Sequence, residues 1–338
     1  MASPVDVADP GWFLFDYRPE HDRFAFARVP LERLTRSAFL DQRLALDEAP
    51  VALDAGSVLA DLPTPLASPA LLFHTAFCGS TLLARALDAP PDAVSLKEPL
   101  ALHSLGRAAL RTGWSEPLPA RLRAALTLLA RPWTPDGRVL LKPANQANGL
   151  LPHILAAAPD ARAILLYSDL REFIVSCLKK GPEAETRVRW MAQALLPFTT
   201  LPARLGLDVR TPFNLVESCA LAWYAQIELY ADALANDRSD RLRSLDLDTM
   251  LAAPADVVDA CAAWLGLSGQ DVAARAARVF GRNSKTDAPY DPLKRAAERD
   301  EVLREYGPLV DSAVGWAQAT VGAVAVQPAD WKPLLPTR

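Results

Sequence analysis

The chain has 338 residues, of which 51% are hydrophobic, and its formal net charge is −4. A chain of this length buries a large core, in one large domain or two smaller ones. The weakly acidic balance excludes a global basic field of the kind that binds nucleic acid or an anionic membrane. An anionic ligand would therefore need a local site.

Cysteine and histidine are sparse. The four cysteines form no CxxC pair and the four histidines are scattered, so the sequence has neither a disulfide framework nor a zinc motif, and no metal is expected. No apolar run approaches the ~20 residues of a membrane span. The first fifteen residues lack the basic and apolar regions of a signal peptide. These features favour a cytoplasmic protein without a membrane span.

The N-terminal part reads as a small unit. Residues 11–32 predict two short strands around a polar turn, and residues 31–44 predict a short helix. The stretch 49–70 is rich in Pro, Ala and Ser, which is typical of a boundary. We therefore expect residues 1–66 to form an N-terminal extension or a small α+β subdomain, and residues 67–338 to form the main domain.

Strand and helix patterns alternate after this boundary. The predicted strands are 70–77, 92–99, 137–143, 161–169 and 241–248, and the predicted helices are 80–88, 101–112, 118–131, 150–159 and 170–180. Continuous apolar strands between helices indicate a parallel sheet that is covered on both faces. The sequence therefore predicts an α/β fold: a three-layer P-loop-type parallel sheet flanked by helices, with a mostly helical C-terminal half.

A short turn, Cys78-Gly79-Ser80-Thr81, joins the first of these strands to its helix. A helix N-terminus offers free backbone N–H groups and the positive end of the helix dipole, which together attract anions. Gly79 lets a ligand approach the backbone, and the two hydroxyl residues add donors. The Walker A pattern would require a lysine at the position of Ser80. The turn alone is equally typical of an ordinary strand-to-helix connection capped by Ser80.

Polar residues also follow the later strands. Lys97 and Glu98 close the second strand, Lys142 closes the third, and Ser168 closes the fourth. The carboxyl ends of neighbouring parallel strands face one crevice, where ligands bind in such sheets. We therefore expect one shared site. His74, inside the first strand, is expected to be a core histidine rather than a base.

Taken in order, these parts resemble the P-loop sulfotransferase superfamily, which transfers a sulfuryl group from 3′-phosphoadenosine 5′-phosphosulfate to a hydroxyl or amine. The segment CGSTLL (78–83) resembles the phosphosulfate loop of the family, and Glu98-Pro99 resembles its acidic motif. SDLREFIVS (168–176) has the frame of the 3′-phosphate motif, and NSKTDAPYDPLKR (283–295) resembles a late segment of many bacterial members. The resemblance covers about residues 70–316.

The resemblance implies roles for particular residues. Backbone amides of the loop would hold the phosphosulfate, Lys142 would neutralise the leaving oxygen, and Glu98 would act as general base. An ion pair of Glu98 with Lys97 or Lys142 is an equally good interpretation. The implied donor-binding residues are Phe77, Cys78, Gly79, Ser80, Thr81, Leu82, Ser168, Ser176 and Lys285. Cys78 has no histidine nearby in the sequence, so we do not expect it to be a nucleophile.

Three positions depart from the family pattern. Phe77 replaces a basic residue, Ser168 replaces the 3′-phosphate arginine, and Ala144 replaces a histidine. The residues that could restore the lost charge are Arg171, Arg282 and Lys285. Losing an arginine removes a charge-assisted contact to phosphate. Two alternatives therefore stay open: a P-loop transferase with another nucleotide donor, and a binding module that kept the fold without catalysis. The acceptor, a small molecule or a peptide, is not defined by the sequence.

Overall fold

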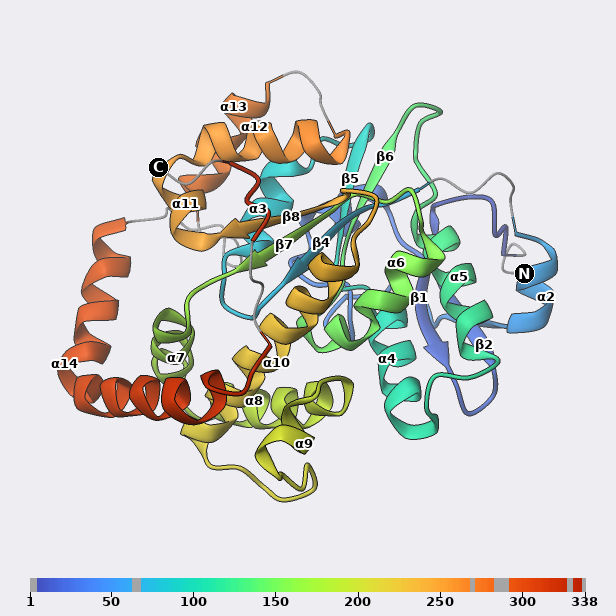
Figure 1. Ribbon diagram of the computed structural model, residues 1–338. Helices are drawn as coiled ribbons and strands as arrows, with labels where there is room; N and C mark the ends of the chain where they lie inside the picture. Colours follow the sequence, from blue (N-terminus) through green and yellow to red (C-terminus); the bar gives the residue numbers. More distant parts are fainter. Residues whose placement is uncertain (1–4, 63–67, 268–270, 283–291, 327–330, 336–338) are drawn as a thin grey trace.

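The computed structural model describes residues 5–62, 68–267, 271–282, 292–326 and 331–335. A five-stranded parallel sheet in the order β5-β6-β4-β7-β8 lies at its centre (Figure 1). Its strands are β4 (Ala70–His74), β5 (Ala93–Lys97), β6 (Arg138–Lys142), β7 (Ala163–Tyr167) and β8 (Leu242–Asp246). Each lies within a strand predicted from the sequence, so the predicted α/β class is confirmed.

The connections of this sheet change direction between β4 and β7. The chain leaves β4 toward β5 on one side, whereas it leaves β7 toward β8 on the other side. β4 and β7 are neighbours, with His74 opposite Leu166. Ligands of open α/β sheets bind at the carboxyl ends of strands where the direction of the connections changes. The residues after β4 and β7 therefore occupy the favoured position for a ligand.

Helices cover both faces of the central sheet. Leu71 and Phe73 of β4 pack on one face, and Ala70 and Leu72 pack on the other, as the alternation of a strand requires. The first face packs against α4 (Leu100–Thr112), α5 (Leu118–Leu129) and α6 (Leu151–Ala157). The second packs against α3 (Ser80–Leu87), α11 (Leu247–Ala252), α12 (Pro254–Leu265) and α13 (Val272–Phe280).

A helical lobe with its own hydrophobic cluster follows β7, in the lower part of Figure 1. It contains α7 (Leu170–Lys179), α8 (Pro182–Leu195), α9 (Leu201–Leu205), α10 (Leu215–Asn236), α14 (Pro292–Ala317) and the short helices η2 (Leu196–Phe198) and η3 (Gln318–Gly322). The short helix η1 (Asn145–Leu150) comes earlier in the chain, between β6 and α6. An ion pair of 2.6 Å between Arg299 and Glu172 ties α14 to α7. None of the helices that the structure describes is long and apolar enough to span a membrane.

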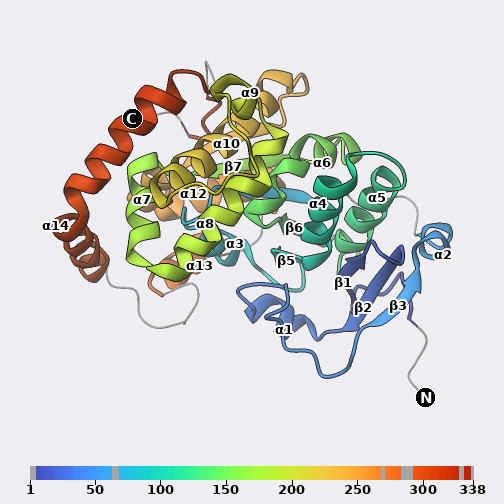
Figure 2. The same cartoon turned by 90° about the horizontal axis from the view of Figure 1, so that it is seen from below.

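A three-stranded antiparallel sheet lies apart from this lobe, against α4 and α5 (Figure 2). It contains β1 (Trp12–Arg18), β2 (Arg23–Arg28) and β3 (Val51–Asp54), with the helices α1 (Leu31–Arg36) and α2 (Ala55–Ala60). The two strands predicted within 11–32 are confirmed. The helix predicted over 31–44 is too long, because the chain turns away at Ser37. The stretch 49–70 is not a plain boundary, since it carries β3 and α2.

The C-terminal segment adds to the far edge of the central sheet. Ser244 of β8 donates its N–H to Lys332 O at 2.7 Å and accepts from Leu334 N at 2.9 Å. The Trp331 ring stacks on Tyr167, at the end of β7, with the ring centroids 4.4 Å apart. The last described residues are therefore fastened to the sheet by backbone and aromatic contacts.

Candidate functional site

The turn between β4 and α3 is tight. Phe77 and Gly79 both have left-handed conformations, with φ of 64° and 75°. A Cβ atom at Gly79 would lie 2.8 Å from Met250 Cε, the flexible end of that side chain, so it is mainly the positive φ that favours glycine here. The first bond of α3 runs from Leu83 N to Gly79 O. The preceding N–H groups of α3 thus have no carbonyl of their own helix to bind.

The side chain of Cys78 turns inward from this loop. Its Sγ donates to Thr75 O at 2.7 Å, and burial raises the pKa of the thiol to about 11. A thiol with this pKa is protonated at neutral pH and is a poor nucleophile. Cys78 therefore supports the shape of the loop, and the expectation that it is not a nucleophile fits this environment.

Lys142 and Glu98 form an ion pair beside the loop, at the carboxyl ends of β6 and β5. Lys142 Nζ lies 2.6 Å from Glu98 Oε1; the lysine side chain is fully buried, and the glutamate side chain is 14% exposed. Burial acts to raise the pKa of Glu98, but Lys142, together with His74 and Arg43, outweighs it and lowers that pKa. The ion-pair interpretation of Glu98 is therefore what the structure shows, and Lys142 is its partner.

The side chain of Lys97 lies away from the Lys142–Glu98 pair. Its Nζ donates to Thr35 O at 3.0 Å and to Ser95 O at 2.9 Å, and lies 3.7 Å from Asp88 Oδ2. Burial lowers the pKa of Lys97 to about 8. This lysine links β5 to α1, and it does not pair with Glu98.

His74 is buried, as expected of a core histidine, yet it lies at the edge of the site. Its Nδ1 is 3.1 Å from Thr75 O, and its Nε2 is 3.1 Å from Pro143 O and 3.8 Å from Glu98 Oε1. Burial and the charge of Lys142 lower the pKa of His74 to about 3, against the opposing effect of Glu98 and the two carbonyls. The ring is therefore neutral at pH 7 and donates through one nitrogen.

Two buried hydroxyl groups flank the loop without a hydrogen-bond partner in the described part of the chain. They belong to Thr75, directly after β4, and to Ser168, directly after β7. The backbone carbonyl of Ser168 accepts a hydrogen bond from Trp223 Nε1 at 2.8 Å, so Ser168 is held in place. An unsatisfied buried hydroxyl costs about 1–3 kcal/mol.

The frame that resembles a 3′-phosphate motif is only partly suited to an anion. Ser176 lies half-buried on α7, two turns beyond Ser168. The N-terminus of α7 is already capped, because the Asp169 carboxylate accepts from Glu172 N at 2.9 Å. Arg171 is paired with Asp311 of α14 at 2.6 Å, so it does not replace the missing arginine.

The other two residues considered as replacements lie at a boundary of the described chain. Arg282 is exposed at the end of the stretch 271–282, and Lys285 lies outside the described residues. The described residues also contain no group of three His, Cys, Asp or Glu side chains that could hold a metal ion.

Sequence reasoning missed a cation that lies directly against the loop. Lys180 Nζ is 3.8 Å from the centroid of the Phe77 ring, which itself packs against Phe173. The pair Lys179-Lys180 reads in the sequence as an ordinary basic helix end. The left-handed conformation of Phe77, which no sequence pattern indicates, brings the Phe77 ring against Lys180.

Comparisons with known proteins gave matches among solved structures alone. No protein-family model matches the sequence, and no curated protein matches it either. Among solved structures, the chain is similar to a sulfotransferase domain from the curacin biosynthetic pathway (TM-score 0.44, 12% identity, 78% of this chain and 100% of that chain). It is also similar to a sulfotransferase from Alicyclobacillus acidocaldarius (TM-score 0.41, 17% identity, 76% of this chain and 97% of that chain). A third similar structure is a sulfotransferase from Mycobacterium avium (TM-score 0.44, 14% identity, 74% of this chain and 78% of that chain). These similarities say nothing about activity.

Proposed function

We propose that this chain is a sulfotransferase-like enzyme that transfers a sulfuryl group from 3′-phosphoadenosine 5′-phosphosulfate to a hydroxyl or amine acceptor. The observation that carries the proposal is the meeting of three parts at one crevice: the glycine loop before α3, the Lys142–Glu98 pair, and the orphaned hydroxyls of Thr75 and Ser168. The ordered motifs of the sequence support the same activity.

The residues present suit the donor. The free N–H groups of α3, with Ser80 and Thr81, would bind the phosphosulfate end, and the unpaired hydroxyl of Thr75 would gain a partner. Lys180 would add positive charge from the side of Phe77. When bound, the donor supplies a sulfuryl group on a good leaving group, the adjacent phosphate.

The paired residues then have complementary tasks. The bond between sulfur and the bridging oxygen breaks as a bond from the acceptor oxygen to sulfur forms. Lys142 stabilises the negative charge left on the bridging oxygen, and Glu98 takes the proton of the acceptor hydroxyl. Since these two side chains are bound to each other at 2.6 Å, both tasks require the pair to separate when substrates enter.

One observation favours a second candidate, a P-loop transferase with a different nucleotide donor. Ser168 carries no charge, and the Asp169 carboxylate next to it would repel a 3′-phosphate. A non-catalytic binding module is the third candidate, although a buried lysine paired with a carboxylate is costly to keep without a function. We place the protein in the cytoplasm, because all four cysteines are free and buried.

A thermal-shift panel with adenosine 3′,5′-bisphosphate, ADP and Mg-ATP tests the proposal. A ligand at 100 times its Kd adds about 2.7 kcal/mol, or on the order of a few degrees in Tm. We expect the bisphosphate to stabilise the protein and ADP to do so less. Stabilisation by ADP or Mg-ATP alone would move the protein to the second candidate, and no response to any of them would favour the third.

A matched pair of glycine variants links this response to the loop. Gly79→Ala forces a side chain into a left-handed position and against Met250, whereas Gly206→Ala does so at a left-handed position with open space around it. The response to the bisphosphate should be lost in Gly79→Ala and kept in Gly206→Ala. An unchanged response in both variants would show that the ligand binds elsewhere.

A further inference from the structure

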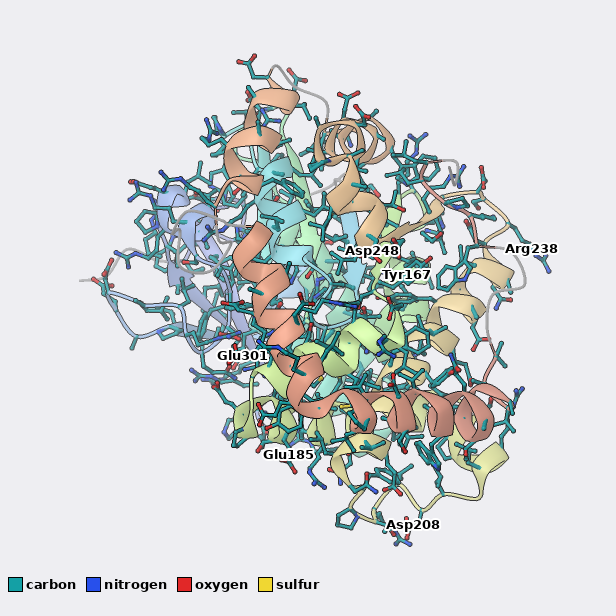
Figure 3. The ribbon with its side chains drawn as sticks, turned by 90° about the vertical axis from the view of Figure 1, so that its left-hand side faces the viewer. Tyr167, Glu185, Asp208, Arg238, Asp248 and Glu301 are labelled. Carbon is teal, nitrogen blue, oxygen red and sulfur yellow. The ribbon has the colours of Figure 1, made fainter. Side chains whose placement is uncertain are left out.

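The backbone bonds between β4 and β7 stop just before the candidate site. Thr75 N donates to Leu166 O at 2.9 Å, and the described residues contain no later backbone bond between these two strands. The chain then continues into the loop after β4 and into Ser168 after β7; Tyr167, the last residue of β7, is labelled in Figure 3. The separation between the loop and Ser168 therefore depends on contacts other than those of the sheet.

A buried asparagine holds the end of β4. The pairing of β4 with β6 covers only Ala70 and Leu71, so the sheet gives the carbonyl of His74 no partner. Asn148 Nδ2 donates to His74 O at 3.1 Å and also to Gln226 Oε1 of α10 at 3.1 Å. Asn148 is fully buried, and its Oδ1 has no hydrogen-bond partner in the described part of the chain. Because a buried unsatisfied oxygen is costly, the bonds of the Asn148 N–H groups are what offsets this amide.

The helix that carries Gln226 also holds the end of β7. Trp223 Nε1 of α10 donates to Ser168 O at 2.8 Å. Trp223 and Gln226 are three residues apart, so they lie on the same face of α10. Gln226 is itself fixed, because its Nε2 donates to Ala222 O at 2.8 Å. One face of one helix thus contacts both strand ends, directly at β7 and through Asn148 at β4.

We infer that Trp223 and Gln226 are positioning residues for the donor, because they set the separation between the loop and Ser168. Gln226 acts through Asn148. The two contacts act at or directly beside Thr75 and Ser168, whose buried hydroxyl groups have no partner among the residues that the structure describes. This inference rests on the proposed function and adds to it the residues that shape the donor site from behind.

Two variants of nearly unchanged size test the inference. Trp223→Phe removes the bond to Ser168 O and keeps a ring, and Asn148→Leu removes the bond to His74 O and keeps the volume. Gln226→Met breaks only the bond between α10 and Asn148, so it is the milder variant should Asn148→Leu not fold.

Two measurements are made on each variant. Amide hydrogen exchange without ligand, followed on peptides that cover residues 75–83 and 168–171, should be about two- to tenfold faster, as expected for the loss of one hydrogen bond. The Kd of adenosine 3′,5′-bisphosphate, measured by calorimetry, should rise by a similar factor. With the full donor, KM should rise while kcat changes by less than about twofold, because neither variant removes Lys142 or Glu98.

The chain contains a matched control for each variant. Trp264 Nε1 donates to Ala163 O at 3.3 Å, so Trp264→Phe removes the same kind of bond from the opposite end of β7. Asn145 lies on η1 like Asn148, but its Nδ2 contacts Met191 Sδ at 2.9 Å. Trp264→Phe and Asn145→Leu should leave both the exchange of the two peptides and the Kd unchanged, even where they lower the free energy of unfolding. This comparison separates positioning from a purely structural role.

Each outcome decides. Faster exchange together with weaker binding of the bisphosphate, in the variants and not in the controls, supports the inference. It is wrong if the variants bind the bisphosphate as tightly as the native chain, or if the controls weaken binding equally. A native chain that does not bind the bisphosphate would overturn the proposed donor, and the exchange rates alone would then decide whether α10 positions the two strand ends.

Discussion

Lys142 and Glu98 are joined twice. The backbone N–H of Glu98 donates to Lys142 O at 2.6 Å, and Lys142 Nζ donates to Glu98 Oε1 at the same distance. The strand pairing of β5 and β6 thus holds the two side chains together before any ligand enters. The backbone pairing fixes the positions of the two residues, so their side chains stay close to each other even when the ion pair opens for substrates.

Removing the lysine of this pair should affect both stability and rate. Lys142→Met leaves the Glu98 carboxylate half-buried without its partner, so we expect a loss of about 1–3 kcal/mol in the free energy of unfolding. The transfer rate should fall about 10²–10³-fold, as for other positioned transition-state cations and donors. Urea unfolding and kcat measure the two effects. The double variant Lys142→Met, Glu98→Gln should recover stability but no activity; a double variant as unstable as the single one would contradict this account.

Glu98 is also held in a strained backbone conformation, with φ of 59°. A residue with a Cβ atom pays about 1–2 kcal/mol for this conformation, and glycine does not. We therefore expect Glu98→Gly to be about 1 kcal/mol more stable than Glu98→Ala, the reverse of the usual order. Urea unfolding of both variants measures this difference. Equal free energies of unfolding would show that the backbone at position 98 relaxes out of the left-handed conformation.

His74 should make stability depend on pH. Its pKa is about 3 in the folded protein and about 6.5 in an unfolded chain. Between these values the unfolded state binds a proton that the folded state does not, so stability falls as pH drops below about 6.5, by up to ~1.4 kcal/mol per pH unit.

A histidine variant isolates this contribution. His74→Gln should be less stable than the native chain at pH 7.5, and the difference should narrow at pH 5. His21→Gln, at an exposed position, is the matched control for the loss of a histidine as such. A gap for His74→Gln that does not change with pH would mean that the ring has the same pKa in the folded and the unfolded state.

The cysteines should be chemically silent in the folded protein. All four are free and buried, and burial raises the pKa values of Cys78, Cys177 and Cys261. At pH 8 a thiol reagent such as dithiobis(nitrobenzoate) should label none of them in the native state and all of them in denaturant. Rapid labelling of Cys78 in the native protein would revive the nucleophile hypothesis.

The alternation of apolar strands and helices was sufficient to predict the central sheet from sequence. β4 to β7 are short apolar segments that are buried along almost their whole length, and such segments carry a strong local signal. The N-terminal helix was predicted too long because Leu40 has the pattern of a helix yet bonds to Lys97 and Leu100. Tertiary hydrogen bonds overrode local propensity there. β3 was missed because its pairing with β2 is not visible in its own four residues.

The candidate site, like the fold, could be predicted from the sequence only in part. Glu98 and Lys142 could be placed together from the sequence, because both end neighbouring strands of one sheet. Lys180 could not, since it reaches the Phe77 ring from the end of α7 and belongs to no motif. Arg171 looked available from the sequence, but α14, more than 100 residues later, supplies its partner Asp311.

The occupied edges of the central sheet have a consequence for solubility. On β8, Ser244 already exchanges backbone hydrogen bonds with the C-terminal segment, and on β5 the N–H of Ser95 is taken by the Asp88 side chain at 2.8 Å. An outer strand with open backbone groups is a template on which other chains can add and form aggregates. Residues 332–334 thus cover part of the β8 edge, so a form truncated before residue 331 should precipitate more readily during expression.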